Sequence, residues 1–184
     1  MATDRRFCRF STSPETAAFS VTSIPPDGLC LSAFLVLTER TASPPRVLLG
    51  RIDPRAAWDH WGALDAARVA AWQDRWMLPA SHLLFLESPQ AAAERLRTEL
   101  TGLSARPLAG PIVVSDVYAP ERHPAHGSHW DIEFIFRGDA VVSELKPPAP
   151  WRTLEFVDVS TLRATDLARS HGDILASAGL AIGR

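Results

Sequence analysis

Histidines and carboxylates gather between positions 121 and 133 of this 184-residue chain. His123, His126 and His129 recur at every third position, and Asp131 and Glu133 follow them. Such a tract can hold Zn²⁺ or another borderline metal, although its spacing matches no strong zinc signature. On an extended strand His129, Asp131 and Glu133 share one face, where a carboxylate could serve as a general acid or base. The structural alternative is a solvated hairpin loop beside an ion-paired strand face.

Tryptophans form a second group of candidate ligand-binding residues. Trp58, Trp61 and Trp72 lie within 52–75, and Trp76 follows directly. They could pack a short helix against the body of the protein. Alternatively, the indole rings of Trp58 and Trp61 could form a wall or lid that stacks on a flat ligand. Trp130 is a third candidate for stacking.

The most informative segment spans residues 76–103 and reads WMLPASHLLFLESPQAAAERLRTELTGL. Its Leu78–Pro79, Glu87, Arg95, Glu99 and Gly102–Leu103 stand at fixed spacings. In type and spacing the segment resembles the Nudix box, G-x5-E-x7-R-E-U-x-E-E-x-G-U, where U is a bulky apolar residue. The likeness extends over about residues 28–180.

The segment also departs from that pattern at four box positions. Ser81 replaces the box glycine, Leu96 replaces the glutamate after the arginine, Arg97 replaces the apolar residue, and Leu100 replaces the second glutamate of the pair. In Nudix hydrolases the helix glutamates bind Mg²⁺ or Mn²⁺ and help to activate water. Leucine supplies no oxygen ligand, so a full metal cluster cannot assemble on this helix. The box is therefore degenerate.

One hypothesis implied by the resemblance is a divergent hydrolase that cleaves a phosphoanhydride in a nucleoside-diphosphate-linked small molecule. Glu87 and Glu99 would then hold a weakly bound Mg²⁺ or Mn²⁺, with Zn²⁺ at the histidine tract as the alternative metal. Arg95 would orient Glu99, either within the site or as a simple ion pair four residues away on the helix. Asp131 or Glu133 would supply the base.

The alternative hypothesis is a catalytically silent Nudix-like binding or regulatory module. Leu96 and Leu100 would line its site with apolar surface, and restored glutamates at these positions would recruit metal. A third version has the fold reused for a substrate that lacks a diphosphate. His82 stands where the family often has a histidine, and it would hold the loop or contact the substrate.

The elements that must position these groups follow from hydrophobic periodicity and from turn signals. Ser88 is a suitable helix N-cap, Pro89 a favoured first residue and Gly102 a suitable stop. Alternation and apolar runs predict strands at 29–38, 46–51, 111–118, 130–137 and 151–159. They also predict helices at 63–72 and 88–100 and one or two closing helices at 161–178. The first two strands suggest a hairpin. This order predicts an α+β fold, and the resemblance implies a Nudix-like α/β/α sandwich with a mixed central sheet.

Composition limits the remaining classes of function. The net charge is −2 and 46% of the residues are hydrophobic, which favours a soluble globular domain without general attraction for nucleic acid or a membrane surface. Two cysteines, Cys8 and Cys30, form no disulfide framework, so we expect a cytoplasmic protein. We expect one domain at 28–184 with a Trp-rich insertion at 52–75. Residues 1–27 form an extension that could add strands and serve a homodimer.

Overall fold

The computed structural model describes residues 29–39, 43–58, 64, 66–84, 86–103, 107–118, 129–140, 145, 150–169 and 171–183. The N-terminal extension, Trp61, His123 and His126 lie outside these residues. The elements run in the order β1 (Leu29–Glu39), β2 (Arg46–Ile52), α2 (Ala66–Trp72), β3 (Ala80–His82), α3 (Pro89–Leu96), the π-helical turn η1 (Arg97–Thr101), β4 (Ala109–Tyr118), β5 (His129–Ala140), β6 (Trp151–Asp158), the 3-10 turns η3 (Val159–Thr161) and η4 (Ala164–Asp166), and α4 (His171–Ser177).

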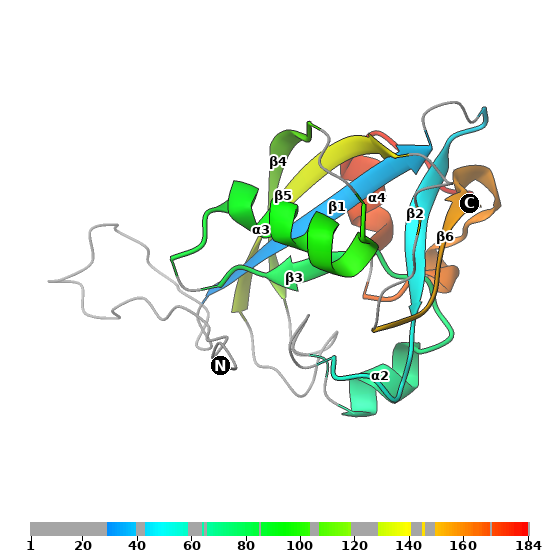
Figure 1. The fold of residues 1–184 in the computed structure, drawn as a ribbon, viewed down its shortest axis with the longest axis horizontal. Helices are drawn as coiled ribbons and strands as arrows, with labels where there is room; N and C mark the ends of the chain where they lie inside the picture. The colour runs from blue at the N-terminus through cyan, green and yellow to red at the C-terminus, as the bar shows by residue number, and fades with distance from the viewer. Residues whose placement is uncertain are drawn as a thin grey trace, which may run out of the picture.

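The strands form one mixed sheet in the order β4-β5-β1-β2-β6, and β3 pairs with β1 off this path (Figure 1). β1 and β5 are parallel, with Leu29 opposite Trp130 and Glu39 opposite Ala140. The pairs β1–β2, β1–β3, β2–β6 and β4–β5 are antiparallel. The predicted mixed sheet and the predicted hairpin of the first two strands are therefore confirmed.

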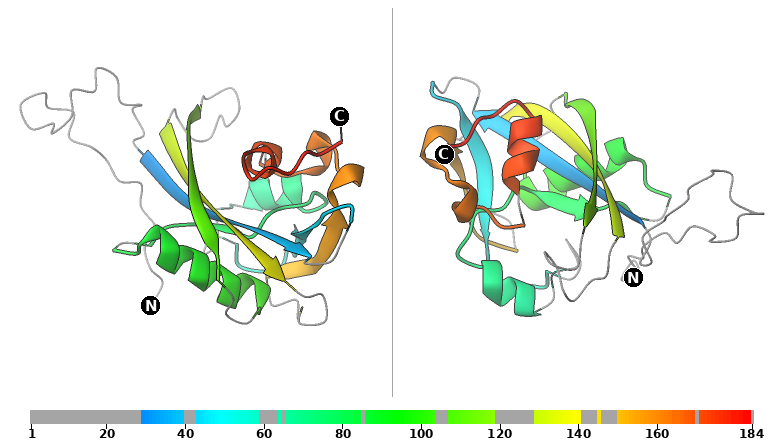
Figure 2. Two further views of the ribbon diagram at one scale, coloured as in Figure 1. Left: turned by 90° about the horizontal axis from the view of Figure 1, so that it is seen from above. Right: turned by 180° about the vertical axis from the view of Figure 1, so that it is seen from behind.

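Two helices cover opposite faces of this sheet, as the left panel of Figure 2 shows for α3 and α4. Successive side chains of a strand point to opposite faces. Leu35 and Leu37 of β1 therefore join the cluster beneath α3, whereas Phe34 and Val36 join the cluster beneath α4. The α/β/α sandwich predicted from the sequence is confirmed, and each face of the sheet has its own core.

The ends of α3 follow the predicted capping chemistry. The Ser88 Oγ atom accepts a hydrogen bond from the Ala91 backbone N–H at 3.1 Å, and Pro89 is the first helical residue. The helix continues through η1 and stops at Gly102, whose φ of 66° is readily adopted by glycine. These signals fix both ends of the helix that carries the box residues.

The C-terminal segment, expected to form one or two closing helices at 161–178, contains a 3-10 turn and an α-helix. The turn is η4, and the helix is α4, which begins at His171. Burial and, to a smaller extent, the nearby Arg169 charge together lower the pKa of His171 to about 3. The neutral Nδ1 atom accepts a hydrogen bond from the Leu78 backbone N–H at 3.0 Å. His171 therefore fastens α4 to the segment that leads into β3.

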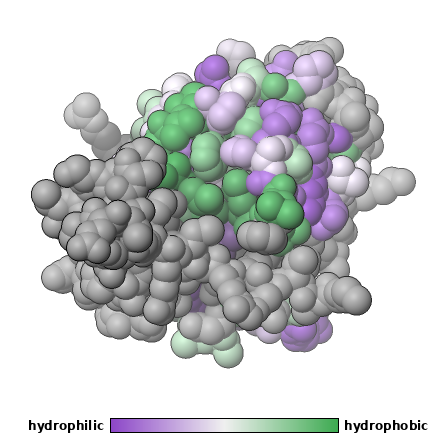
Figure 3. Space-filling view, turned by 90° about the vertical axis from the view of Figure 1, so that its left-hand side faces the viewer, coloured by the Kyte–Doolittle hydropathy of each residue, from purple (hydrophilic) through white to green (hydrophobic). Residues whose placement is uncertain are grey.

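None of the helices formed by the described residues is long and apolar enough to cross a membrane. Figure 3 views the molecule from the left-hand side of Figure 1 and shows apolar surface beside a hydrophilic strip. Leu86 and Val113 are large apolar side chains that are exposed. Scattered exposure of this kind is ordinary in folded proteins.

Candidate functional site

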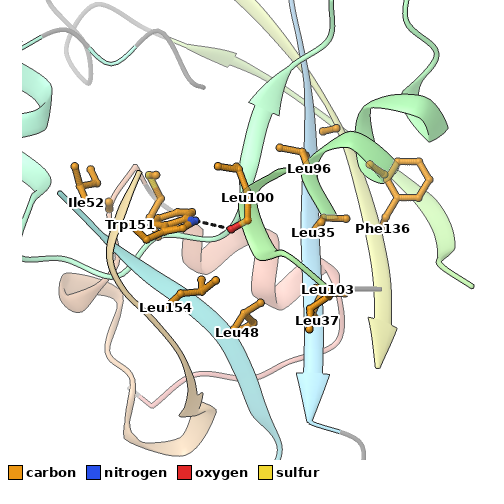
Figure 4. Packing of buried hydrophobic residues seen from close by; sticks show 14 of the residues in the cluster. Leu35, Leu37, Leu48, Ile52, Leu96, Leu100, Leu103, Phe136, Trp151 and Leu154 are labelled. Atoms are coloured by element: carbon orange, nitrogen blue, oxygen red, sulfur yellow. Dashed lines mark hydrogen bonds between the residues drawn. The ribbon is translucent and has the colours of Figure 1, made fainter. Parts of the chain in front are cut away.

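The two leucines that replace box glutamates lie inside the core. Leu96 and Leu100 are both 0% exposed, and they belong to the same cluster as Leu35 of β1 and Phe136 of β5. Figure 4 shows these side chains packed together, with Leu48 and Leu154 of the neighbouring strands close by. The helix face that we expected to line a site is closed by aliphatic side chains.

Trp151 completes this closure from β6. Its indole Nε1–H donates a hydrogen bond to the Leu100 carbonyl at 2.8 Å, drawn as a dashed line in Figure 4. The ring of Trp58 packs edge-on against it, with ring centroids 4.9 Å apart. A Cβ atom at Gly50 would overlap the Trp151 ring, so only glycine gives the indole room. We call Leu96, Leu100, Trp58 and Trp151 the plug.

The position of Trp58 decides between the two interpretations of that residue. Its side chain is buried, and its Nε1–H donates to the Asp53 carbonyl at 2.9 Å. Trp58 is thus a core residue with a satisfied indole and not a stacking surface for a ligand. Trp130 is half-buried on the α3 face of β5, the same face that carries Phe134 and Phe136.

Glu87 and Arg95 form a partly buried two-point ion pair. Arg95 Nε donates to Glu87 Oε1 at 2.7 Å, and Arg95 Nη2 donates to Glu87 Oε2 at 2.9 Å. The backbone N–H of Leu84 also donates to Glu87 Oε2, at 2.8 Å, and Arg95 Nη2 reaches the His82 carbonyl. This pair ties the loop after β3 to α3.

The same pair corrects the expectation that Arg95 orients Glu99. The turn at Ser88 and Pro89 brings Glu87 alongside the helix, where the guanidinium meets it at short range. Glu99 is exposed on η1, beside the buried Leu100. Arg95 therefore acts on Glu87, and the sequence spacing of four residues to Glu99 is not used.

Asp131 and Glu133 lie on the other face of the sheet. In register, Asp131 is opposite Cys30 and Glu133 is opposite Ser32, and the next pair, Phe34 and Ile135, belongs to the core under α4. Both carboxylates are buried, at 6% and 8% exposure. The predicted common face of these two residues is confirmed, but the sheet separates them from α3 and its Glu87.

A buried polar row on the α4 face was missed by sequence reasoning. Cys30 and Ser32 alternate with the leucines of β1, and their side chains lie 3.4 Å apart, Sγ to Oγ. Burial raises the pKa of the Cys30 thiol, and the negative charge of Asp131 raises it further. The thiol stays neutral, which makes Cys30 a poor nucleophile. Its alternation within an apolar run was the signal that could have placed it.

The residues present do not fit the divalent metal that the resemblance implies. Leucine provides no oxygen, and both Glu87 oxygens already accept hydrogen bonds. Glu99 contributes a single exposed carboxylate. Among the described residues no group of three His, Cys, Asp or Glu side chains gathers that could hold a metal ion. His129 begins β5, but its side chain is outside the described part.

Comparison with solved structures identifies the fold. No protein-family model and no curated protein matches the sequence. A MutT/nudix family protein from Enterococcus faecalis has a TM-score of 0.58 at 15% identity, covering 89% of this chain and 64% of its own. The NUDIX domain of Shewanella oneidensis NrtR, solved with ADP ribose, has a TM-score of 0.55 at 15% identity, covering 91% of each chain. The chain has a Nudix fold.

Within the Nudix fold, α3 and η1 are the box helix and the loop before them carries Glu87. The present chain spans 64% of the length of the Enterococcus protein. Identities of 15% define the architecture, whereas the chemistry depends on the side chains of this chain. At the box helix these side chains form the plug, and the Glu87–Arg95 pair ties the preceding loop to the helix.

Proposed function

We propose that this chain is a Nudix-fold binding or regulatory module whose box helix carries no metal-dependent hydrolysis. The observation behind the proposal is the complete burial of Leu96 and Leu100 against the sheet. A hydrolytic site needs water and a metal ion at this helix face. Here apolar side chains exclude both.

The polar residues of the box support the same conclusion. The Glu87 carboxylate accepts hydrogen bonds from Arg95 and from the Leu84 backbone N–H, so its role is structural. Asp131 and Glu133 could act as acid or base only on the α4 face of the sheet. The hydrolase hypothesis would therefore depend on Glu99 alone.

A nucleoside-diphosphate-linked small molecule is the ligand class that we propose. Support comes from the likeness to a Nudix domain that was solved with ADP ribose. Formation of a homodimer through residues 1–27 and a cytoplasmic location remain predictions from the sequence.

The test compares binding with turnover. ADP-ribose is titrated into the purified chain by calorimetry, and product release is then followed with Mg²⁺ and with Mn²⁺. We expect binding and no product. Glu99→Gln is the informative variant, and Glu155→Gln, an exposed carboxylate on β6, is its matched control.

Two results would count against the proposal. Metal-dependent product release that Glu99→Gln abolishes and Glu155→Gln retains would establish the hydrolase hypothesis instead. If ADP-ribose neither binds nor is turned over, the proposed ligand class is wrong.

A further inference from the structure

A surface cavity of about 390 Å³ lies at the carboxyl ends of β1 and β5, on the face covered by α4. These two parallel strand ends lie side by side in Figure 1. In sheets with parallel strands, ligands commonly bind in the crevice beyond the carboxyl ends, and the volume suits a small molecule. The lining residues are Val36, Thr38, Pro107, Ala109, Arg137, Gly138, Asp139, Ala178 and Leu180.

Arg137 brings a positive charge to this cavity without an ion pair of its own among the described residues. Its guanidinium donates one long hydrogen bond, from Nη1 to the Ala178 carbonyl at 3.5 Å. Its neighbours in register, Val36 and Ala109, are both uncharged. Arg95 and Arg97, by contrast, are held by Glu87 and Glu94. Within the described part of the chain, an anion at Arg137 would therefore have no carboxylate to displace.

The remaining polar groups restrict the charge of a ligand. Asp139 lies two residues further along the same face of β5, and the Thr38 hydroxyl donates to its Oδ1 atom at 3.3 Å. This carboxylate repels a multiply charged anion more than a singly charged one. Val36, Ala178 and Leu180 offer apolar walls to the rest of the molecule.

We infer that this cavity binds a small organic molecule with one carboxylate on an apolar body, and that Arg137 anchors the carboxylate. The inference uses no residue of the box helix, and therefore it stands or falls separately from the proposed function. It assigns a ligand class to a face of the sheet that the box does not reach.

Hexanoate is a simple probe of this chemistry. It is titrated into ¹⁵N-labelled protein, and the backbone amide signals of Gly138, Asp139 and Leu180 are followed. Hexanol and inorganic phosphate are titrated in parallel, because the first lacks the charge and the second lacks the apolar body. We expect saturable shifts with hexanoate and at least about tenfold weaker binding of the other two.

Three variants assign the binding to the cavity. Arg137→Gln removes the anchoring charge and should lower the affinity for hexanoate at least about tenfold, without changing the response to hexanol. Ala109→Leu fills the cavity from the exposed strand β4 and should abolish the shifts. Arg75→Gln changes the same charge at an exposed position outside the cavity lining and should leave them unchanged.

Any of three outcomes would overturn the inference. They are the absence of saturation by hexanoate at millimolar concentration, equal affinity for hexanol, and unchanged hexanoate affinity in a folded Arg137→Gln variant. Arg137 is exposed, so the variant should fold, and an unaltered spectrum away from the cavity verifies this.

Discussion

Restoring a glutamate at position 100 tests whether the box helix carries a plug or a metal site. Leu100 is completely buried, so Leu100→Glu removes core packing and places a carboxyl group there. Loss of the leucine alone costs about 3 kcal/mol. Keeping a carboxyl with an ordinary pKa near 4.3 neutral at pH 7 costs about 4 kcal/mol more. The total of about 7 kcal/mol approaches the whole stability of many domains.

The assay is chemical and thermal unfolding of four proteins: the natural chain, Leu100→Ala, Leu100→Glu and Ala91→Glu. Ala91 is an exposed position on the same helix and provides the matched control. We expect Leu100→Ala to lower the melting temperature by about 10 °C, since 1 kcal/mol corresponds to about 2–4 °C for a domain of this size. Leu100→Glu should be largely unfolded at pH 7, and Ala91→Glu should resemble the natural chain.

Two further readouts separate the alternatives. Because the buried carboxyl is neutral, the penalty of Leu100→Glu relative to the natural chain should shrink by about 1.4 kcal/mol for each pH unit between pH 7 and the ordinary pKa of about 4.3. Mg²⁺ and Mn²⁺ should not rescue the variant. A Leu100→Glu protein as stable as Ala91→Glu, with a melting temperature raised by Mg²⁺, would refute the plug and favour an open metal site.

Three other predictions concern the rest of the fold. The native pKa of His171 lies at about 3, below the ordinary 6.5, so between these values the unfolded chain binds a proton that the folded chain does not. Urea melts should therefore show the free energy of unfolding falling by about 2 kcal/mol from pH 7 to pH 5. The His171→Asn variant should show a shallower pH dependence. Glu87→Gln should cost about 2 kcal/mol in the same melts, because Arg95 keeps a partly buried charge without its carboxylate partner; an unchanged midpoint would contradict this. The Cys30 thiol, tested in a Cys8→Ser background, should react with a thiol reagent only after denaturant is added, because burial raises its pKa; rapid labelling of the folded protein would be the contrary result.

The architecture was largely predictable because local signals agreed with one another. Ser88, Pro89 and Gly102 fixed the box helix, and apolar alternation fixed the strands. Alternation also placed Asp131 and Glu133 on one strand face, which the sheet confirms. Such features depend on neighbours within one or two turns or on the period of a strand, and these are properties of the sequence itself.

The assembly of the candidate site was less predictable because it depends on contacts between distant segments. The partner of Arg95 was taken to be Glu99, four residues away, but the loop before α3 folds back and supplies Glu87. The sequence likewise left open whether the Trp58 indole covers a ligand or the core. The indole of Trp58 lies in the core because it packs against Trp151, a residue more than ninety positions later.

The sequence by itself determined that two box glutamates are missing and that no complete Nudix metal cluster can form on this helix. It could not determine what replaced that cluster, because leucines can line an open pocket as well as fill a core. The tertiary structure decided this by bringing β1, β5 and β6 against α3, so that Leu96 and Leu100 lose all contact with solvent. It also put the buried carboxylates on the opposite face of the sheet, since the side a strand residue faces has meaning only once both layers are in place.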